Sequence, residues 1–316
     1  MAKKRFTLVF FILLLTVLLL SVLFLLLGNK NYSLSEIMSN KIILQLRLPR
    51  LLGIYFTAFL LSVSGYLMQI MTHNPIAEMS TLGISGGASF ALSLLLTLGL
   101  TTNGTLSTLA AAIGAFLVLS IVMILTARTH FHPLKVILVG TSVGLFATSL
   151  ASALTFSSHR SQAYFLWIVG SFSGLTNMKV LLMAIVSVIF LVLLIFFARP
   201  VQMLGLGDEM ATSLGVSVNR VRIVIMILVA LASGVTVSTV GVISFVGLIA
   251  PHIARRFTRS KFWQTIILSA LAGTLLLLLA DLAARNMFKP YEFPAGSLTM
   301  LLGAPFFLWI IAKEAK

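Results

Sequence analysis

Long runs of apolar residues constrain this chain more than any other feature of its sequence. A helix needs about 20 consecutive apolar residues to cross the hydrocarbon core of a bilayer. Runs of roughly this kind recur along the whole chain and predict about ten transmembrane helices, at residues 6–27, 50–71, 83–100, 108–126, 134–156, 179–198, 222–240, 243–257, 264–284 and 295–312. The sequence therefore predicts an all-α integral membrane protein.

The composition supports one transmembrane domain that occupies residues 1–316. Hydrophobic residues make up 59% of the chain and charged residues 9%, whereas soluble domains carry about 25% charged residues. The chain has no cysteine, which excludes disulfides, cysteine metal sites and thiol redox centres. The net charge of +15 comes from cations that are dispersed over loops and helix ends, so we expect a lipid bilayer and no nucleic acid as partner.

The distribution of these cations predicts an orientation. If the N-terminus lies inside, the inner segments hold 14 and the outer segments 8 of the 22 lysines and arginines. Cytoplasmic loops of membrane proteins carry an excess of lysine and arginine. We therefore expect both termini, and the segment 199–222, to lie in the cytoplasm.

The segment 199–222 predicts a short capped helix between two apolar runs. Pro200 is expected to stop the preceding helix, because proline lacks the amide hydrogen that the next turn needs. Asp208 brings negative charge to the start of the short helix, and Gly215 is typical of its end. From these residues alone, the segment is either a solvated loop with a helical turn or a surface on which a soluble partner acts.

The segment 28–50 is the longest predicted outer segment. Ser33 and Glu36 have the spacing of a capping box and predict a short surface helix. Arg47 and Arg50 then stand on either side of a proline. These guanidiniums either reach lipid headgroups or form bidentate pairs with the carboxylates of an external partner, and the residues alone leave both interpretations open.

Charged or reactive residues within the predicted spans are few. Asp281 and Arg285 are four residues apart in the ninth span and can pair on one helix face; charges at such depth are either functional or a tolerated internal pair. The motif at residues 83–86 resembles the serine segment of an intramembrane protease, which would need a base such as His252. Close helix packing explains its glycines better.

The sequence lacks the motifs for binding ATP and most of the residues needed for ion-coupled transport. It contains no GxxxxGK[ST] phosphate-binding loop, so any ATP must be bound by a partner. An ion-coupled secondary transporter would need carboxylates or histidines near the middle of the bilayer. Asp281 is the only acid clearly within a predicted span, which makes this alternative weaker.

The chain resembles the FecCD-type permease subunits of bacterial ABC importers for iron–siderophore complexes, haem and cobalamin. The matching motifs run in the family's order over nearly the whole chain. They are RLPR at Arg47–Arg50, GYLMQ at Gly65–Gln69, NPIAEMSTLGISGGA at Asn74–Ala88, GDEMATSLG at Gly207–Gly215, FVGLIAPHIAR at Phe245–Arg255, AD..AR at Ala280–Arg285 and E.PAG...MLLGAPFF at Glu292–Phe307.

This resemblance implies a type II importer fold in the bacterial cell membrane and a transport subunit that is not itself an enzyme. It implies no cofactor, no catalytic residue and no metal site. The implied partners are two ATPase subunits, a second permease subunit and an extracytoplasmic binding protein. We expect a ferric siderophore as cargo, with cobalamin or haem as alternatives.

The resemblance also implies roles for particular residues. Docking of the binding protein is expected at Arg47, Arg50 and Arg285. Coupling to the ATPase is expected at Gly207, Asp208, Glu209, Ala211, Leu214 and Gly215. An inner gate is expected at Asn74 and Ile76, with a second gate element around Leu134 in the loop 132–135. By the same analogy, the fifth and tenth spans line the path between two permease subunits.

Overall fold

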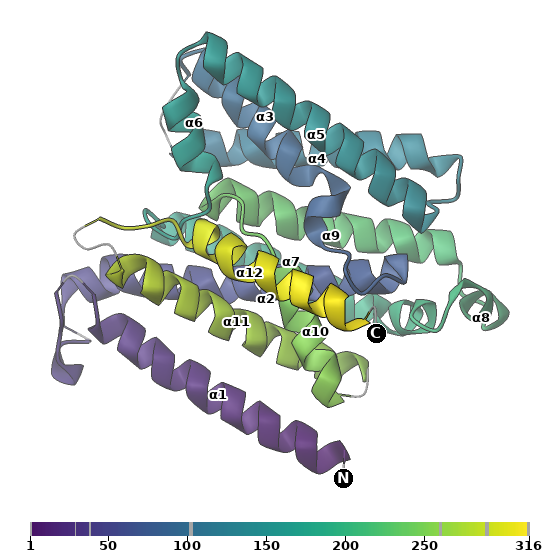
Figure 1. The fold of residues 1–316 in the computed structure, drawn as a ribbon, viewed down its shortest axis with the longest axis horizontal. Coiled ribbons are helices and arrows are strands. Elements are labelled where there is room, and N and C mark those ends of the chain that lie inside the picture. The colour runs from purple at the N-terminus through teal and green to yellow at the C-terminus, as the bar shows by residue number, and fades with distance from the viewer. Residues whose placement is uncertain are drawn as a thin grey trace. The chain divides into compact units, whose positions relative to one another are not determined.

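The computed structural model describes residues 2–28, 30–37, 39–100, 104–258, 261–287 and 291–314. Helices make up the regular structure of these residues, apart from one isolated pairing of Val169 with Val242 (Figure 1). The elements in chain order are α1 (Ala2–Leu26), η1 (Leu34–Glu36), η2 (Ile43–Arg47), α2 (Leu48–Thr72), η3 (Met79–Leu82), α3 (Ile84–Thr97), α4 (Gly104–Ala127), α5 (Pro133–Ser157), α6 (Ser161–Ile168), α7 (Asn177–Leu204), α8 (Asp208–Ser213), α9 (Val218–Val240), α10 (Val246–Thr258), α11 (Phe262–Asn286) and α12 (Ala295–Glu314).

The chain divides into two compact units. The first unit comprises Met1–Val63, Gly170–Ile185 and Ile243–Lys316, and the second comprises Ser64–Val169 and Val186–Val242. The division falls inside α2 and inside α7, so each of these helices contributes residues to both units.

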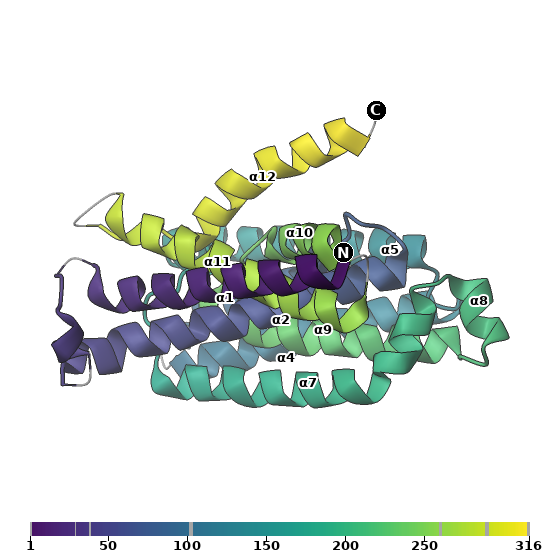
Figure 2. The same cartoon turned by 90° about the horizontal axis from the view of Figure 1, so that it is seen from below.

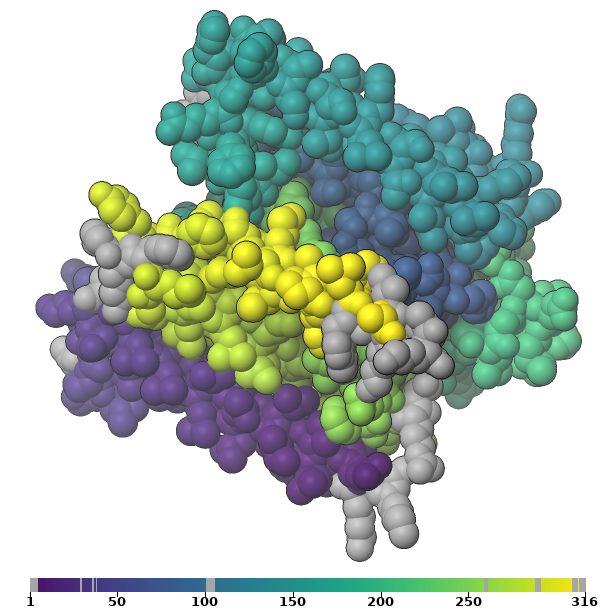
Figure 3. All heavy atoms as spheres, in the orientation of Figure 1, coloured from purple at the N-terminus to yellow at the C-terminus, as the bar shows by residue number. Residues whose placement is uncertain are grey.

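Helix α11 is central to the first unit. It contacts α1, α10 and α12, and its atoms lie directly against those of α1 in the space-filling view (Figure 3). Helix α12 leans away from α11 toward its C-terminal end (Figure 2). Leu248 and Ile249 of α10 form a small apolar cluster on which Phe245, Phe306 and Phe307 pack, which joins α10 to α12.

Close packing at glycines organises the second unit. Helix α3 contacts both α4 and α5 (Figure 1), and α4 also contacts α9. A Cβ atom at Gly83 would collide with the backbone of Gly140, and one at Gly86 would collide with the backbone of Gly144. Small residues let helices approach closely where no hydrophobic force drives them together. The predicted packing role of the segment 83–86 is therefore confirmed.

Seven helical segments of the described chain are long and apolar enough to cross a bilayer. They are Arg5–Leu26, Ile43–Thr72, Leu106–Ala127, Pro133–Ser157, Asn177–Leu204, Val218–Val240 and Phe262–Asn286. The apolar helices Ile84–Thr97 and Ala295–Leu308 are shorter, and α10 has 13 residues. Every predicted span thus contains a helix, but length and composition support membrane crossing for seven of them.

Two helix boundaries differ from those expected. The helical segment that contains the predicted second span begins at Ile43 and not at residue 50, so the C-terminal part of the predicted outer segment 28–50 is helical. Helix α7 passes through Pro200 and ends at Leu204. Prolines are tolerated in membrane helices because local π geometry and neighbouring groups accommodate the missing hydrogen bond. The π-helical turn η2 ends at Arg47, directly before α2, whose second residue is Pro49.

Some predictions concern residues of which little or nothing is described. The surface helix expected after Ser33 is a single 3₁₀ turn, Leu34–Glu36, and the side chain of Glu36 lies outside the described part of the chain. Of the cations that predict the orientation, Arg259, Lys289 and Lys316 also lie outside the described residues.

Candidate functional site

Charged side chains gather in one cluster in each unit. The arginine cluster of the first unit consists of Arg47, Arg50, Asp281, Arg285 and Glu292. The Asp208 cluster of the second unit consists of His73, His130, Asp208, Asn219 and Arg222. Most of the charged residues singled out in the sequence belong to one or the other.

Arg50 and Asp281 form the core of the arginine cluster. Arg50 Nε donates to Asp281 Oδ2 at 3.0 Å, and Arg50 Nη2 donates to Oδ1 at 2.9 Å. The Asp281 side chain is 0% exposed and that of Arg50 is 9% exposed. The planar guanidinium matches a carboxylate in this two-bond geometry, which fixes both side chains. The predicted pair of Asp281 with Arg285 is also confirmed, with Arg285 Nε 3.5 Å from Oδ2.

Glu292 is the exposed member of this cluster. Its Oε2 accepts a hydrogen bond from Arg50 Nη1 at 2.8 Å, and its side chain is 38% exposed. Backbone hydrogen bonds from Phe293 to Ala284 and from Gly296 to Gly170 hold this part of the chain in place. Arg50 therefore has one buried carboxylate partner and one that water can reach.

The other two arginines contact aromatic rings and backbone carbonyls. Arg47 donates to the carbonyls of Leu25 and Lys30, and its guanidinium lies 4.8 Å from the centre of the Tyr32 ring. The guanidinium of Arg285 lies 3.9 Å from the centre of the Phe24 ring. Cations are attracted to the faces of aromatic rings. These contacts tie η2 and α11 to α1 and to the segment after it.

The geometry changes the interpretation of the three predicted docking arginines. Arg47, Arg50 and Arg285 are 8%, 8% and 5% exposed, and all three bind groups of their own chain. They neither extend freely toward lipid headgroups nor stand on the surface. Tyr291, which precedes Glu292 in the sequence, is 79% exposed.

Asp208 organises the cluster in the second unit. It is the first residue of α8. In both ribbon views, α8 lies beyond the N-terminal end of α9 (Figures 1 and 2). Its Oδ2 accepts a hydrogen bond from Arg222 Nη2 of α9 at 2.6 Å, and its Oδ1 lies 3.4 Å from His73 Nε2. The Arg222 side chain is 5% exposed and that of Asp208 is 44% exposed.

Arg222 extends the contacts of Asp208 to the turn between α4 and α5. Its Nη1 donates to the carbonyl of His130 at 3.4 Å. Asn219 Nδ2, one helical turn before Arg222, lies 3.2 Å from His130 Nδ1. The cluster thus joins α8 and α9 to two turns of the second unit.

Helix α8 has the predicted bounds and an exposed apolar face. Gly207 precedes it with a φ of 113°, Leu214 caps it, and Gly215 follows with a φ of 82°. Ala211 is fully buried, whereas Glu209 is exposed.

Leu206, Met210 and Leu214 are 67%, 53% and 53% exposed. Sequence reasoning named only Leu214 of this apolar face. Met210 lies within α8, whereas Leu206 precedes the helix and Leu214 caps it.

The predicted gate residues lie in two turns of the second unit. Asn74 follows His73, and its side-chain oxygen accepts a hydrogen bond from the backbone of Ile76 at 3.0 Å. The side chain of Ile76 is 37% exposed. Leu134, in the first turn of α5, is 59% exposed. The side chains of these residues point outward enough to meet another molecule.

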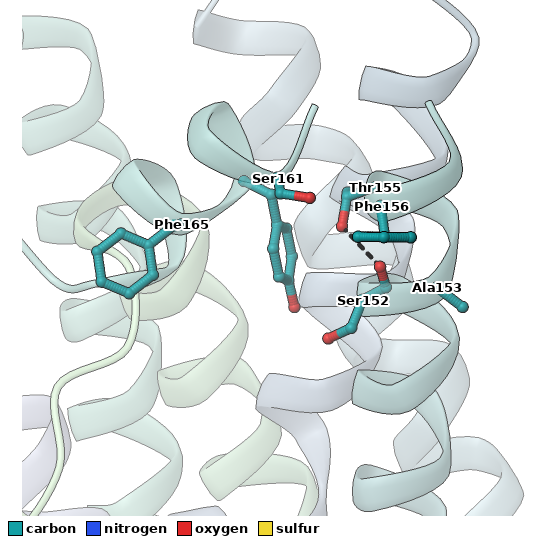
Figure 4. Close-up of a pocket in the computed structure, with 7 residues that line it drawn as sticks. Ser152, Ala153, Thr155, Phe156, Ser161 and Phe165 are labelled. Carbon is teal, nitrogen blue, oxygen red and sulfur yellow. Dashed lines mark hydrogen bonds between the residues drawn. The ribbon is translucent and has the colours of Figure 1, made fainter. Parts of the chain in front are cut away.

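An open pocket of about 580 Å³ lies between α5 and α6. Its lining mixes hydroxyl groups with aromatic rings, including Ser152, Ser161 and Phe165 (Figure 4). Tyr164 also lines it, and burial raises the pKa of its hydroxyl while the nearby Ser89 side chain opposes that shift only in part. Within the described residues, no group of three or more His, Asp or Glu is placed to hold a metal ion.

These features define a polytopic helical membrane protein whose charged groups join helices. A comparison with protein families then gives the family: the model of the FecCD transport family matches residues 12–313. The chain belongs to this family of transport permeases, which are multi-pass proteins of the bacterial inner membrane.

Named relatives and one solved structure support this membership. The iron(3+)-hydroxamate import system permease protein FhuB of Bacillus subtilis (strain 168) is 38% identical over 282 residues, which cover 88% of this chain and 73% of FhuB. The vitamin B12 import system permease protein BtuC of Vibrio vulnificus (strain CMCP6) is 34% identical over 319 residues, or 99% of this chain and 96% of BtuC. A metal-chelate type ABC transporter in an inward-facing conformation superimposes with a TM-score of 0.86 at 26% identity, covering 98% of this chain and 99% of that one.

Proposed function

We propose that the chain is a permease subunit of an ABC importer that carries a ferric siderophore delivered by an extracytoplasmic binding protein. The observation that carries the proposal is the family match over residues 12–313, together with the 38% identity to a permease for iron(3+)-hydroxamate. The chain contains no phosphate-binding loop, so two separate ATPase subunits would bind and hydrolyse the ATP. The chain itself would contribute no catalytic residue.

The proposed topology has ten spans and both termini in the cytoplasm. The seven long apolar helices supply most of the spans, and α3, α10 and α12 would supply the other three. Short helices can complete a membrane domain when other helices cover their ends. The bias of lysine and arginine toward one side supports the orientation.

Helix α8 is the proposed contact with the ATPase. Met210 of α8, with Leu206 before the helix and Leu214 at its end, offers exposed apolar side chains of the kind that partners bury. Gly207 and Gly215 bound the helix and let the chain turn sharply on either side. Asp208, Glu209 and Ala211 would complete the coupling segment, with Ala211 anchoring it to its own unit.

The arginine cluster is the proposed docking region of the binding protein. It holds three arginines and two carboxylates and is therefore positive. A positive patch attracts acidic partners and orients them. Because Glu292 is the exposed partner of Arg50, we propose that a carboxylate of the binding protein replaces Glu292 on docking.

The proposed cargo path lies between this subunit and a second permease subunit. Helix α5 presents Leu145 and Phe156, which are 70% and 79% exposed, and the open pocket beside α6 adds hydroxyl groups to the same region. Helix α12 would be the other element that lines the path. Asn74, Ile76 and Leu134 would close it at the cytoplasmic side.

Reconstitution tests the proposal. The chain, its ATPase and its partner permease would be placed in liposomes with the binding protein and a radio-iron-labelled ferric hydroxamate. We expect uptake that needs both ATP and the binding protein. Uptake by the chain alone, driven by an ion gradient, would contradict the proposal and support a secondary transporter.

Cobalamin is the second candidate cargo. The vitamin B12 permease of Vibrio vulnificus aligns with 99% of this chain, more than the hydroxamate relative does. The same liposomes loaded with cyanocobalamin in place of the iron chelate separate the two. ATP-dependent uptake of cobalamin but not of ferric hydroxamate would replace the first candidate with the second.

A further inference from the structure

One carboxylate of the second unit has partners on two other elements. Asp208, at the start of α8, accepts a hydrogen bond from Arg222 of α9 at 2.6 Å and lies 3.4 Å from the imidazole of His73, directly after α2. Arg222 in turn reaches the carbonyl of His130, in the turn between α4 and α5. A displacement of α8 therefore changes contacts at both turns.

Both of these turns contain a histidine with an unusual backbone conformation. His73 has a φ of 49° and His130 a φ of 52°. Residues with a Cβ atom rarely adopt such positive values, and they do so where surrounding contacts hold them. In both turns those contacts include members of the Asp208 cluster.

His73 directly precedes the first proposed gate segment, and His130 lies in the turn that leads into the second. Asn74 and Ile76 follow His73 in the same turn, and Leu134 lies at the start of α5 after His130. A change in the backbone of either histidine would therefore reorient the residues that follow it.

The two members of the Asp208–Arg222 ion pair differ in exposure, which lets the pair pass a movement of α8 to Arg222. Arg222 is nearly buried, whereas 44% of the Asp208 side chain is exposed. A buried guanidinium that loses its carboxylate is left uncompensated. Helix α8 therefore cannot move away without either drawing Arg222 after it or leaving that charge unpaired.

We propose that Asp208 is a positioning residue that ties α8 to both turns that precede the gate segments. This inference rests on the proposed function, in which the ATPase moves α8. A shift of α8 acts on His73 directly through Asp208 and on His130 through Arg222. One carboxylate thus makes the two gate segments respond together.

The experiment uses the complete complex in liposomes with radio-iron-labelled ferric hydroxamate. ATP-dependent uptake by the unaltered complex tests the proposed function by itself. Asp208→Asn is then expected to lower the uptake per ATP hydrolysed by about tenfold. Arg222→Gln is expected to lower this ratio as well, and the double variant no further than the larger single effect, because both changes break the Asp208–Arg222 hydrogen bond.

Two further variants separate positioning from a general loss of structure. His73→Gln keeps a hydrogen-bond donor for Asp208 and should keep most of the coupling, whereas His73→Phe should lose it. Arg128→Gln is the matched control, because it removes an exposed cation from the turn that contains His130. It should leave the uptake per ATP unchanged.

The results that would overturn the inference are distinct from failure of the proposed function. If the unaltered complex transports iron but Asp208→Asn retains the normal ratio, Asp208 does not position the gates. Effects of Asp208→Asn and Arg222→Gln that add in the double variant would also overturn it. So would loss of the ATPase from the purified Asp208→Asn complex, since Asp208 would then serve docking only.

Discussion

The two charged clusters use the same chemistry in opposite ways. In the arginine cluster, Asp281 is fully buried and makes two hydrogen bonds with Arg50, a residue 231 positions away in the sequence. In the Asp208 cluster, the carboxylate is 44% exposed and makes one close hydrogen bond with Arg222, 14 positions away. A buried two-bond pair holds helices in fixed positions, whereas a half-exposed carboxylate can exchange partners. We therefore infer that the arginine cluster holds the helices of its unit in fixed positions, whereas the contacts of the Asp208 cluster can rearrange.

Asp281→Asn is the change with the largest expected effect on this comparison. It removes the carboxylate that compensates Arg50 and Arg285, and breaking a buried pair costs about 3–5 kcal/mol. We expect a strongly lowered midpoint of thermal unfolding in detergent and little protein in the membrane. A midpoint near that of the unaltered protein would show that the buried pair does not hold the first unit together.

Arg50→Lys sharpens the same point with a smaller change. Lysine keeps the positive charge but cannot make the parallel pair of hydrogen bonds to Asp281 while also reaching Glu292. Loss of hydrogen bonds to a charged group predicts about 1.5–3 kcal/mol of destabilisation. Thermal unfolding of the purified variant measures it, and an unchanged midpoint would mean that charge alone, without the two-bond geometry, is sufficient.

Asp208→Asn should affect stability less than either change in the first unit. Solvent reaches the carboxylate, and Arg222 keeps its hydrogen bond to the carbonyl of His130. We therefore expect the free energy of unfolding to fall by about 1–2 kcal/mol. The midpoint of thermal unfolding is again the measurement. Destabilisation as large as that of Asp281→Asn would remove the distinction between a fixed and a movable cluster.

Glu292→Gln is expected to have the smallest effect on stability. Its pair with Arg50 is exposed on one side, so about 1 kcal/mol or less is at stake. Because Glu292 is proposed to compete with the binding protein for Arg50, the variant should bind that protein more tightly. Binding to the complex in detergent measures this, and weaker binding would show that Glu292 takes part in docking itself.

Local features of the sequence were sufficient to predict several parts of the molecule. The apolar runs gave the position of every long helix, because crossing a bilayer requires length and apolar composition together. Charge at Asp208 and the glycines on either side gave the bounds of α8. The spacing of four residues gave the pair of Asp281 with Arg285.

Features that depend on distant residues or on relaxed local geometry could not be predicted. No sequence pattern reveals that Arg50 binds Asp281, since the pairing arises only when α2 and α11 come together. The same holds for the contact of His73, directly after α2, with Asp208 of α8. The end of α7 was misplaced because Pro200 was taken to end the helix, whereas α7 continues through it to Leu204.

The central claim is that α8 faces the cytoplasm, where an ATPase can move it, while the arginine cluster meets a partner outside. Because the chain has no cysteine, single cysteines at Ser213 and Tyr291, both exposed, can be labelled with a membrane-impermeant maleimide. We expect Ser213→Cys to react only in inside-out vesicles and Tyr291→Cys only in intact cells with a permeable outer layer. Labelling of Ser213→Cys from outside the cell would contradict the account.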